Sequence, residues 1–408
     1  MTDLGLLLLR HGYLAVARDR AARGGTDTYV SRLLGRRTVV IGEPDGARAF
    51  YDESLVRRAG AVPAPLAWLL FGRGAVHGLD GTAHRDRKRL LLDALDPDTL
   101  GGLVDDVAAD LGRRIASWPG REVHLRDELT TAYGAAALRW AGLEVTASEA
   151  DTVSRRLGDI VDGFGFTWPA YGRAWRSRRW AERWARRVVD DVRAGRAAPP
   201  ETTALRRIAD SDLDSRTAGV ELINVLRPTV AVAWLGVFAA LALASSSPDD
   251  RARLRERSAV HARYAFAQEV RRTTPFVPVL TAIAVRAGRV SDVRVRAGDR
   301  LLLDVVGIDH HADHWPEPHE FRPDRFLDRD ALAAAAAYDL VPQGGGHPSG
   351  HRCPGESLTQ RLLSETVRVL AAVELDVSPA TADATRMPTL PEGSDSVRVR
   401  GVVSGVAA

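Results

Sequence analysis

Residues 221–238 constrain the fold more than any other part of the chain, because their pattern indicates a long buried helix. Apolar side chains recur there at the i, i+3, i+4, i+7 spacing of a helix with a buried face. Yet Arg227 and Pro228 stand side by side in the middle. An unpaired charge is costly to bury, and an internal proline removes a helix hydrogen bond at a cost of about 3 kcal/mol or more. A core helix of this kind needs a partner for its charge.

The longest apolar segment, residues 228–244, is borderline in length for crossing a membrane. A proline at its start and an arginine just before it favour a buried core helix, so we expect no membrane insertion. The 56 basic and 53 acidic residues leave a net charge of +3, which provides no broad footprint for nucleic acid. The single cysteine, Cys353, excludes a disulfide within the chain and fits a reducing, cytoplasmic location.

The whole chain, residues 1–408, is predicted to form one mostly helical domain with a small β component, since neither repeats nor a long linker divides it. Helical patterns are predicted within residues 36–52 (after a strand and a turn), 84–95, 97–244 and 357–373. Patterns typical of strands cover residues 279–285, 293–307 and 396–404, and an irregular segment covers 310–326.

The sequence "PQGGGHPSGHRCPGE", residues 342–356, places the only thiol in a glycine-rich loop before a helix. A helix N-terminus favours a thiolate, and its N–H groups can tune a metal bound to the sulfur. Glycines allow the backbone to pass close to a flat cofactor. Two other interpretations remain for the loop alone: an inert buried cysteine, or a nucleophile with His347 or His351 as its base.

The loop resembles the haem-ligand signature of the cytochromes P450, in which a cysteine thiolate is the proximal iron ligand. "EVRR" places Glu269 and Arg272 at i, i+3 on one helix face, and "FRPDRF" supplies Arg325. In that family, an arginine at this place completes a Glu–Arg–Arg network behind the haem. An i, i+3 pair alone is usually a surface pair. The three motifs in this order indicate the family over essentially the whole chain.

The resemblance implies the cytochrome P450 fold, mainly α with a small β component, as a single haem-thiolate domain. It also implies haem b (iron protoporphyrin IX) with the Cys353 thiolate as axial ligand. The side chains that would bind the haem propionates are His84 and Lys88 in "HRDRK", His351, and, as a weaker candidate, Arg58. Taken alone, His84 would be interpreted as a surface residue of a helix.

In most cytochromes P450 the central helix crosses the haem and carries an acid–alcohol pair that relays protons. Here Arg227 and Pro228 occupy the matching place, and arginine is no proton donor at working pH. A guanidinium binds a carboxylate bidentately, so an acid substrate anchored by Arg227 could supply the missing acid–base group. A kink at Pro228 would open space above the haem. The alternatives for Arg227 are pairing with a protein carboxylate or snorkelling out of the helix.

This arrangement resembles the fatty-acid peroxygenase branch of the family, to which residues 71–81 and 386–393 are also similar. The branch implies hydroxylation of fatty acids at Cα or Cβ by hydrogen peroxide, or oxidative decarboxylation to terminal alkenes. His77 would lie near the substrate, although an ordinary core histidine is an equal interpretation. Residues that could line the acyl chain, for each of which core packing is also sufficient, are Phe71, Phe164, Phe276, Val277 and Val279.

Residues Thr273 and Thr274 stand where the branch often has aromatic side chains, which leaves the preferred chain length open. We expect no fused flavin or iron–sulfur domain, and the sequence contains no dinucleotide fingerprint after a strand. Hydrogen peroxide or a separate ferredoxin-type redox partner is therefore expected to drive the reaction. Two other classes remain. One is a haem protein that senses or carries acids or gases without turnover, and the other is a metal-free Cys–His acyltransferase.

Overall fold

The computed structural model describes residues 2–96, 98–165, 168–328, 330, 333–334, 337–376, 382–392 and 396–403. The helices are α1 (Leu4–His11), α2 (Leu14–Ala21), α3 (Pro44–Phe50), α4 (Ala64–Leu70), α5 (Gly81–Ala94), α6 (Leu100–Ile115), α7 (Leu125–Trp140), α8 (Ala147–Asp162), α9 (Ala170–Arg193), α10 (Ala204–Ala209), α11 (Ser215–Ala244), α12 (Pro248–Arg255), α13 (Val260–Thr273), α14 (Val305–Asp309) and α16 (Glu356–Leu370). Short 3-10 helices are η1 (Val76–Gly78), η2 (Gly163–Gly165) and η3 (Pro323–Phe326).

The strands form three antiparallel or mixed sheets. They are β1 (Thr28–Leu33), β2 (Arg36–Ile41), β3 (Val56–Arg57), β4 (Glu122–His124), β5 (Val279–Ala284), β6 (Gly288–Val290), β7 (Val293–Val295), β8 (Arg300–Asp304), β9 (Val373–Asp376) and β10 (Ser396–Val402). The largest sheet has the order β1-β2-β8-β5-β3, with β2 and β8 parallel. The others have the orders β4-β10-β9 and β6-β7.

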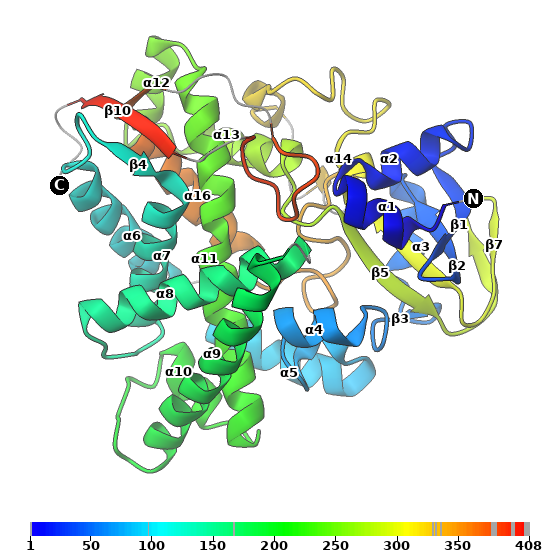
Figure 1. Ribbon diagram of the computed structural model, residues 1–408, viewed down its shortest axis with the longest axis horizontal. Helices are drawn as coiled ribbons and strands as arrows, with labels where there is room; N and C mark the ends of the chain where they lie inside the picture. Colours follow the sequence, from blue (N-terminus) through cyan, green and yellow to red (C-terminus); the bar gives the residue numbers. More distant parts are fainter. Residues whose placement is uncertain are drawn as a thin grey trace.

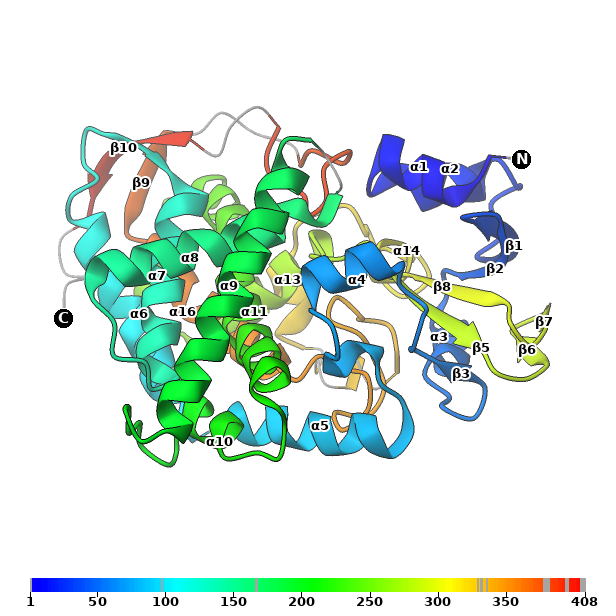
Figure 2. The ribbon, with the colours of Figure 1, turned by 60° about the horizontal axis from the view of Figure 1, so that its bottom comes forward.

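Most of the helices gather on one side of the molecule, and the five-stranded sheet lies on the other together with α1, α2 and α3 (Figures 1 and 2). The glycine-rich loop before α16 lies between these two parts, close to α4 and α5 in both views. Sequence segments far apart therefore meet around this loop, and its cysteine, Cys353, is half-buried.

Helix α11 forms the centre of the helical part. The Asp214 side chain begins it by accepting hydrogen bonds from the amides of Arg216 and Thr217. The helix packs on α7, α9 and α16. It is long and apolar enough to cross a membrane, but 83% of its most apolar window is buried inside the protein. This burial confirms the prediction of a core helix.

Pro228 does not interrupt α11, which continues from Ser215 to Ala244. Proline has no N–H, so it cannot donate to the carbonyl of Asn224 four residues earlier. At the next residue, Thr229 Oγ1 donates to the carbonyl of Val225 at 3.1 Å. The chain on both sides remains helical, and a wider space above the haem remains a prediction.

Most predicted elements are confirmed, including β2 with α3, helix α5 and strand β5. Residues 305–307, predicted to extend a strand, instead begin α14, because the Asp304 side chain accepts a hydrogen bond from the Gly307 amide at 2.9 Å and caps a helix. The last long helix ends at Leu370, before residue 373. Residues 97, 166–167, 393 and 404, which fall in predicted segments, lie outside the described residues.

Candidate functional site

The loop that carries Cys353 is folded back on itself. The Cys353 amide donates to the carbonyl of Gln343 at 3.0 Å, and Gln343 Nε2 lies 3.8 Å from Sγ. Gly344 has φ +88°, and a Cβ there would lie 3.0 Å from the Tyr51 hydroxyl. Gly355, the N-cap of α16, would place a Cβ 3.9 Å from Sγ. Glycine at position 344 therefore allows the loop to turn in a left-handed conformation close to Tyr51.

Burial raises the pKa of the Cys353 thiol, which the Gly355 amide offsets only in part. A cysteine nucleophile needs the opposite shift. Among the described residues, no histidine hydrogen-bonds the sulfur: His347 pairs with Ser349 at 2.7 Å, and the ring of His351 stacks elsewhere. The geometry disfavours the Cys–His acyltransferase and favours a thiol deprotonated by a metal that it binds.

An ionic cluster around Glu356 fixes the cysteine loop to α13. Our sequence interpretation missed this cluster. Glu356 accepts from Arg352 Nε at 2.5 Å and from Arg271 Nη2 at 2.7 Å. These arginines hold the pKa of Glu356 below its usual value despite burial, which alone would raise it. The Arg352 carbonyl accepts a hydrogen bond from Lys88. The i, i+4 spacing of Arg352 and Glu356 in the sequence could have indicated their pairing.

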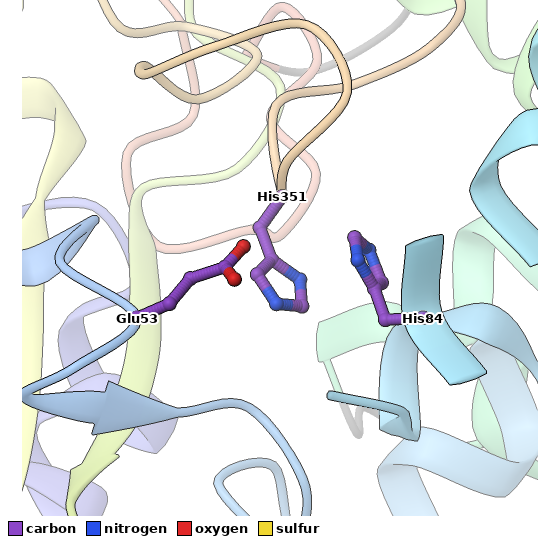
Figure 3. Close-up of side chains that lie close together, drawn as sticks. All are labelled: Glu53, His84 and His351. Carbon is purple, nitrogen blue, oxygen red and sulfur yellow. The ribbon is translucent and has the colours of Figure 1, made fainter. Parts of the chain in front are cut away.

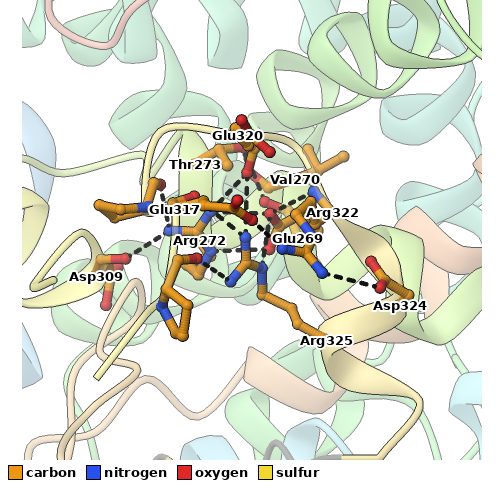
Figure 4. Close-up of polar contacts among 12 residues, drawn as sticks. Glu269, Val270, Arg272, Thr273, Asp309, Glu317, Glu320, Arg322, Asp324 and Arg325 are labelled. Carbon is orange, nitrogen blue, oxygen red and sulfur yellow. Dashed lines mark hydrogen bonds and ion pairs between the residues drawn. The ribbon is translucent and has the colours of Figure 1, made fainter. Parts of the chain in front are cut away.

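Glu269 and Arg272 form a fully buried bidentate pair, with N–O distances of 2.8 and 2.9 Å (Figure 4). Arg325 Nε lies 3.2 Å from Glu269 Oε1, and the Arg322 amide donates to the same oxygen at 2.8 Å. Arg272 also donates to the carbonyl of Asp309 at 2.9 Å. The network ties α13 to the irregular segment that follows α14, because one carboxylate holds donors from both.

Basic side chains gather beside the cysteine loop. His84 and His351 stack with ring centroids 3.9 Å apart, and the His351 ring lies between His84 and Glu53 (Figure 3). The ligand atoms of these three residues lie within 4.8 Å of one another. Burial lowers the pKa of His351 to about 3 and that of Lys88 to about 8. An added anion would reverse these shifts, since it favours the charged forms.

The residues fit a haem. His84 Nδ1 is buried and has no hydrogen-bond partner, so a polar group is missing from its surroundings. A propionate would satisfy it, and Cys353 supplies the thiolate that haem iron accepts. Arg58 fits less well, because its guanidinium already donates to the carbonyls of Phe50 and Thr281 at 3.0 and 3.4 Å.

On the other side of the site, Arg227 is 7% exposed. Within the described residues, it makes no hydrogen bond or ion pair with a carboxylate, and its Nε has no partner. The nearest aromatic contact is Phe71, with the guanidinium carbon 6.0 Å from the ring centroid. Burial, then the nearby Arg178, lower the pKa of Arg227 to about 10. The guanidinium stays charged at neutral pH, so it can bind an anion.

The His77 ring stacks on Phe71, with centroids 3.9 Å apart and an interplanar angle of 11°. Although part of its surface is exposed, desolvation by the surrounding protein, then Arg227, lower the pKa of His77 to about 3. The imidazole is therefore neutral at physiological pH and cannot serve as an imidazolium proton donor there.

The pKa of His77 predicts acid sensitivity. An unfolded histidine binds its proton near pH 6.5, whereas folded His77 binds one only near pH 3, so the unfolded state holds more protons between these values. Stability therefore falls as the pH falls through this window. We expect His77→Gln to lose less stability than the parent between pH 7 and pH 5 in urea unfolding. Equal losses in the two proteins would contradict the assignment.

The segment that carries Phe71 and His77 is held by α11. Glu221 accepts from the Val76 amide at 2.9 Å, and Asn224 donates to the Phe71 carbonyl at 3.1 Å. Neither side chain was singled out in the sequence. Glu221 could have been noticed as an acidic residue within an apolar helical pattern. Its partner Val76 and the Asn224 partner Phe71 are too distant in the sequence to be inferred from it.

The other predicted pocket residues are half-buried in the protein. Phe164 lies in η2, and Phe276 packs against the main hydrophobic core while its carbonyl accepts from the Tyr13 hydroxyl at 2.8 Å. Val277 follows it, and Val279 begins β5.

Comparison with known proteins identifies the family. The family model for cytochrome P450 matches residues 249–389. A structure of cytochrome P450SP alpha in complex with (R)-ibuprofen is 33% identical, with a TM-score of 0.91, and the match covers 99% of this chain and 100% of that one. The chain belongs to the cytochrome P450 family. This membership confirms the predicted fold and implies an oxidoreductase with haem held by a cysteine thiolate.

Two further relatives of this cytochrome P450 refine the placement. Ligand-free cytochrome P450 OleT is 31% identical with a TM-score of 0.90, and the match covers 98% of each chain. OleT and P450SP alpha represent the fatty-acid peroxygenase branch, as predicted. The putative cytochrome P450 137 of Mycobacterium tuberculosis is 33% identical over 102 residues, which are 25% of this chain and 20% of that protein. The chain thus aligns with only about a fifth of this curated relative's length.

Proposed function

We propose that this cytochrome P450 uses hydrogen peroxide to hydroxylate fatty acids at Cα or Cβ, with the substrate carboxylate bound by Arg227. The observation that carries the proposal is the buried, charged guanidinium of Arg227 on the central helix, which pairs with no carboxylate among the described residues. Relatives support an acid as ligand, since an OleT variant was solved with arachidonic acid and P450SP alpha with (R)-ibuprofen.

An acid substrate resolves the charge problem of α11. A buried unpaired charge is unfavourable, and a carboxylate would accept two parallel hydrogen bonds from the planar guanidinium. Arg178 is a nearby cation whose repulsion of Arg227 a bound anion would relieve. Binding of the acid is thus favoured because its carboxylate supplies the countercharge and the hydrogen-bond acceptors that Arg227 does not find among the described residues.

Cys353 would hold the haem iron, and His84, Lys88 and His351 would hold the propionates. When bound, haem supplies the oxidising chemistry by which hydrogen peroxide and a C–H bond become an alcohol and water. The Glu356 and Glu269 clusters would fix the cysteine loop and the segment behind it. These residues keep the thiol in place without reacting themselves.

The substrate carboxylate would also move a proton. Neither neutral His77 nor permanently charged Arg227 is suited to donate and accept protons at pH 7. A carboxylate held by Arg227 could accept a proton from one oxygen of hydrogen peroxide and return it to the other, which is general acid–base catalysis by the substrate. Anchoring of the head presents Cα and Cβ, rather than the chain end, to the oxidant.

The direct test is oxidation of saturated fatty acids of several lengths by the purified holoenzyme and hydrogen peroxide, with products analysed by mass spectrometry. We expect 2- and 3-hydroxy acids, and no oxidation of the fatty alcohol of equal length, which lacks the carboxylate. Terminal alkenes as the main product would make decarboxylation the principal reaction. A spectral response to the acid without any product would favour a sensor, and product only with a ferredoxin would favour a redox partner.

The remaining parts of the proposal concern the chain as a whole. We propose that residues 1–408 form one domain, because the loop of Cys353 contacts segments from both the helical and the sheet parts. A reducing cytoplasm suits the single thiol, which must stay free to bind iron.

A further inference from the structure

Glu221 is a buried acid on α11 that the proposed reaction does not use. Its side chain is fully buried, and both of its oxygens are occupied. Oε1 accepts from the Val76 amide at 2.9 Å and from Arg87 Nη1 at 2.6 Å. Oε2 accepts from Asn224 Nδ2 at 3.0 Å. One carboxylate therefore joins the central helix, the first residue of η1 and helix α5.

The contacts of Glu221 and Asn224 hold both ends of one short segment. Asn224 Nδ2 donates to the Phe71 carbonyl at 3.1 Å, while Glu221 holds the amide of Val76. Between these points, Arg87 donates to the carbonyl of Gly74 at 3.2 Å. We call residues 71–77 the tethered segment.

The tethered segment carries the two rings nearest to the acid-binding arginine. Phe71 contacts Arg227 through its ring, and His77 stacks on Phe71. Glu221 lies six residues before Arg227 on the same helix, about 9 Å along its axis at 1.5 Å per residue. The helix that supplies the guanidinium thus also sets the position of the rings that face it.

We propose that Glu221 is a positioning residue, which holds Phe71 and His77 against Arg227 and so sets where the substrate carboxylate binds. This inference rests on the proposed function. It assigns to Glu221 an effect on acid binding and on the oxidised carbon, exerted through the tethered segment and without contact to the substrate.

Charge also favours a carboxylate at this position. Arg87 pairs directly with Glu221, and Arg178 lies close enough for the acid to favour its charged form. Arg178 is 1% exposed, and its Nη1 and Nη2 have no hydrogen-bond partner among the described residues. Within the described part of the chain, its one ion pair joins Nε to Glu182 at 2.8 Å. Loss of the negative charge on Glu221 would therefore leave the positive charges of Arg87 and Arg178 less compensated.

Glutamine cannot reproduce the hydrogen bonds of Glu221, although it has nearly the same shape. If its oxygen keeps the Val76 amide, its NH₂ group faces the NH₂ group of Asn224, donor against donor. If Asn224 then rotates its amide, the Asn224 oxygen faces the Phe71 carbonyl, acceptor against acceptor. Every orientation breaks at least one tether, so Glu221→Gln is a selective test.

The experiment compares Glu221→Gln with Glu182→Gln, which also removes an acid beside Arg178 but does not touch the tethered segment. Hydrogen–deuterium exchange is measured by mass spectrometry on the holoenzymes, together with fatty-acid titration and the ratio of 2- to 3-hydroxy products. For Glu221→Gln we expect at least tenfold faster exchange confined to residues 71–78, at least tenfold weaker acid binding and a changed product ratio. Glu182→Gln should match the parent.

Three results would overturn the inference. They are unchanged exchange in residues 71–78, faster exchange with unaltered acid binding and product ratio, or equal effects of the two variants. Should Glu221→Gln fold poorly, Asn224→Ala removes the Phe71 tether and one hydrogen bond to Glu221 but keeps the bond to the Val76 amide. It should give the same changes at smaller magnitude. Exchange needs no substrate, so it separates this inference from the proposed function, which fails if Arg227→Ala binds fatty acid like the parent.

Discussion

Arg227→Ala should abolish peroxide-driven oxidation of fatty acids while leaving haem incorporation intact. We expect kcat/KM to fall by roughly 10²- to 10⁴-fold, the usual contribution of a positioned acid–base group, because the substrate carboxylate loses its anchor. The measurement is initial rate against fatty-acid concentration, with the haem spectrum as the check on folding. Since Arg227 has no protein partner among the described residues, its removal should not expose an unpaired acid.

Two variants sharpen this test. Arg227→Lys keeps the charge but not the planar fork, so we expect partial fatty-acid binding with poor turnover. Arg178→Met removes the nearby cation while leaving Arg227 in place, and should preserve binding of the acid. Turnover of Arg227→Ala equal to the parent would eliminate the anchor and, with it, catalysis by the substrate carboxylate.

The parts of the site that sequence could predict depend on short spacings. Glu269 and Arg272 lie three residues apart on one helix, so their pairing follows from helical geometry. The glycine-rich loop before α16 is similarly local. Arg325 is 56 residues from Glu269, and only resemblance to a known family linked the two.

The parts that sequence did not predict depend on packing between distant segments. Glu221 meets Val76 across 145 residues, and nothing in either segment specifies the other. Arg178 belongs to an arginine-rich helix whose charges look like a solvated face, yet it is buried under Gly72, where a Cβ would lie 2.0 Å from its Nη2. Glycine at that position, with φ +86°, makes room for the guanidinium.

Loss of the Glu269 network should lower the stability of the folded protein strongly, whereas loss of Arg227 should mainly lower its activity. Replacing Glu269 with glutamine leaves Arg272 fully buried without its countercharge and weakens the bonds to Arg325 and the Arg322 amide. Breaking one partner of a buried pair costs about 3–5 kcal/mol, because the remaining charge stays desolvated. We expect Glu269→Gln to unfold at lower denaturant concentration and to lose haem more readily than the parent.

The matched control for Glu269→Gln is Asp86→Asn, which breaks an exposed pair of the same i, i+3 spacing with Arg89 on α5. Exposed pairs contribute little, so the unfolding midpoint should remain unchanged there. The double variant Glu269→Gln, Arg272→Met removes the uncompensated charge as well and should recover part of the lost stability. If Glu269→Gln unfolds at the same denaturant concentration as Asp86→Asn, the buried network does not hold this region together.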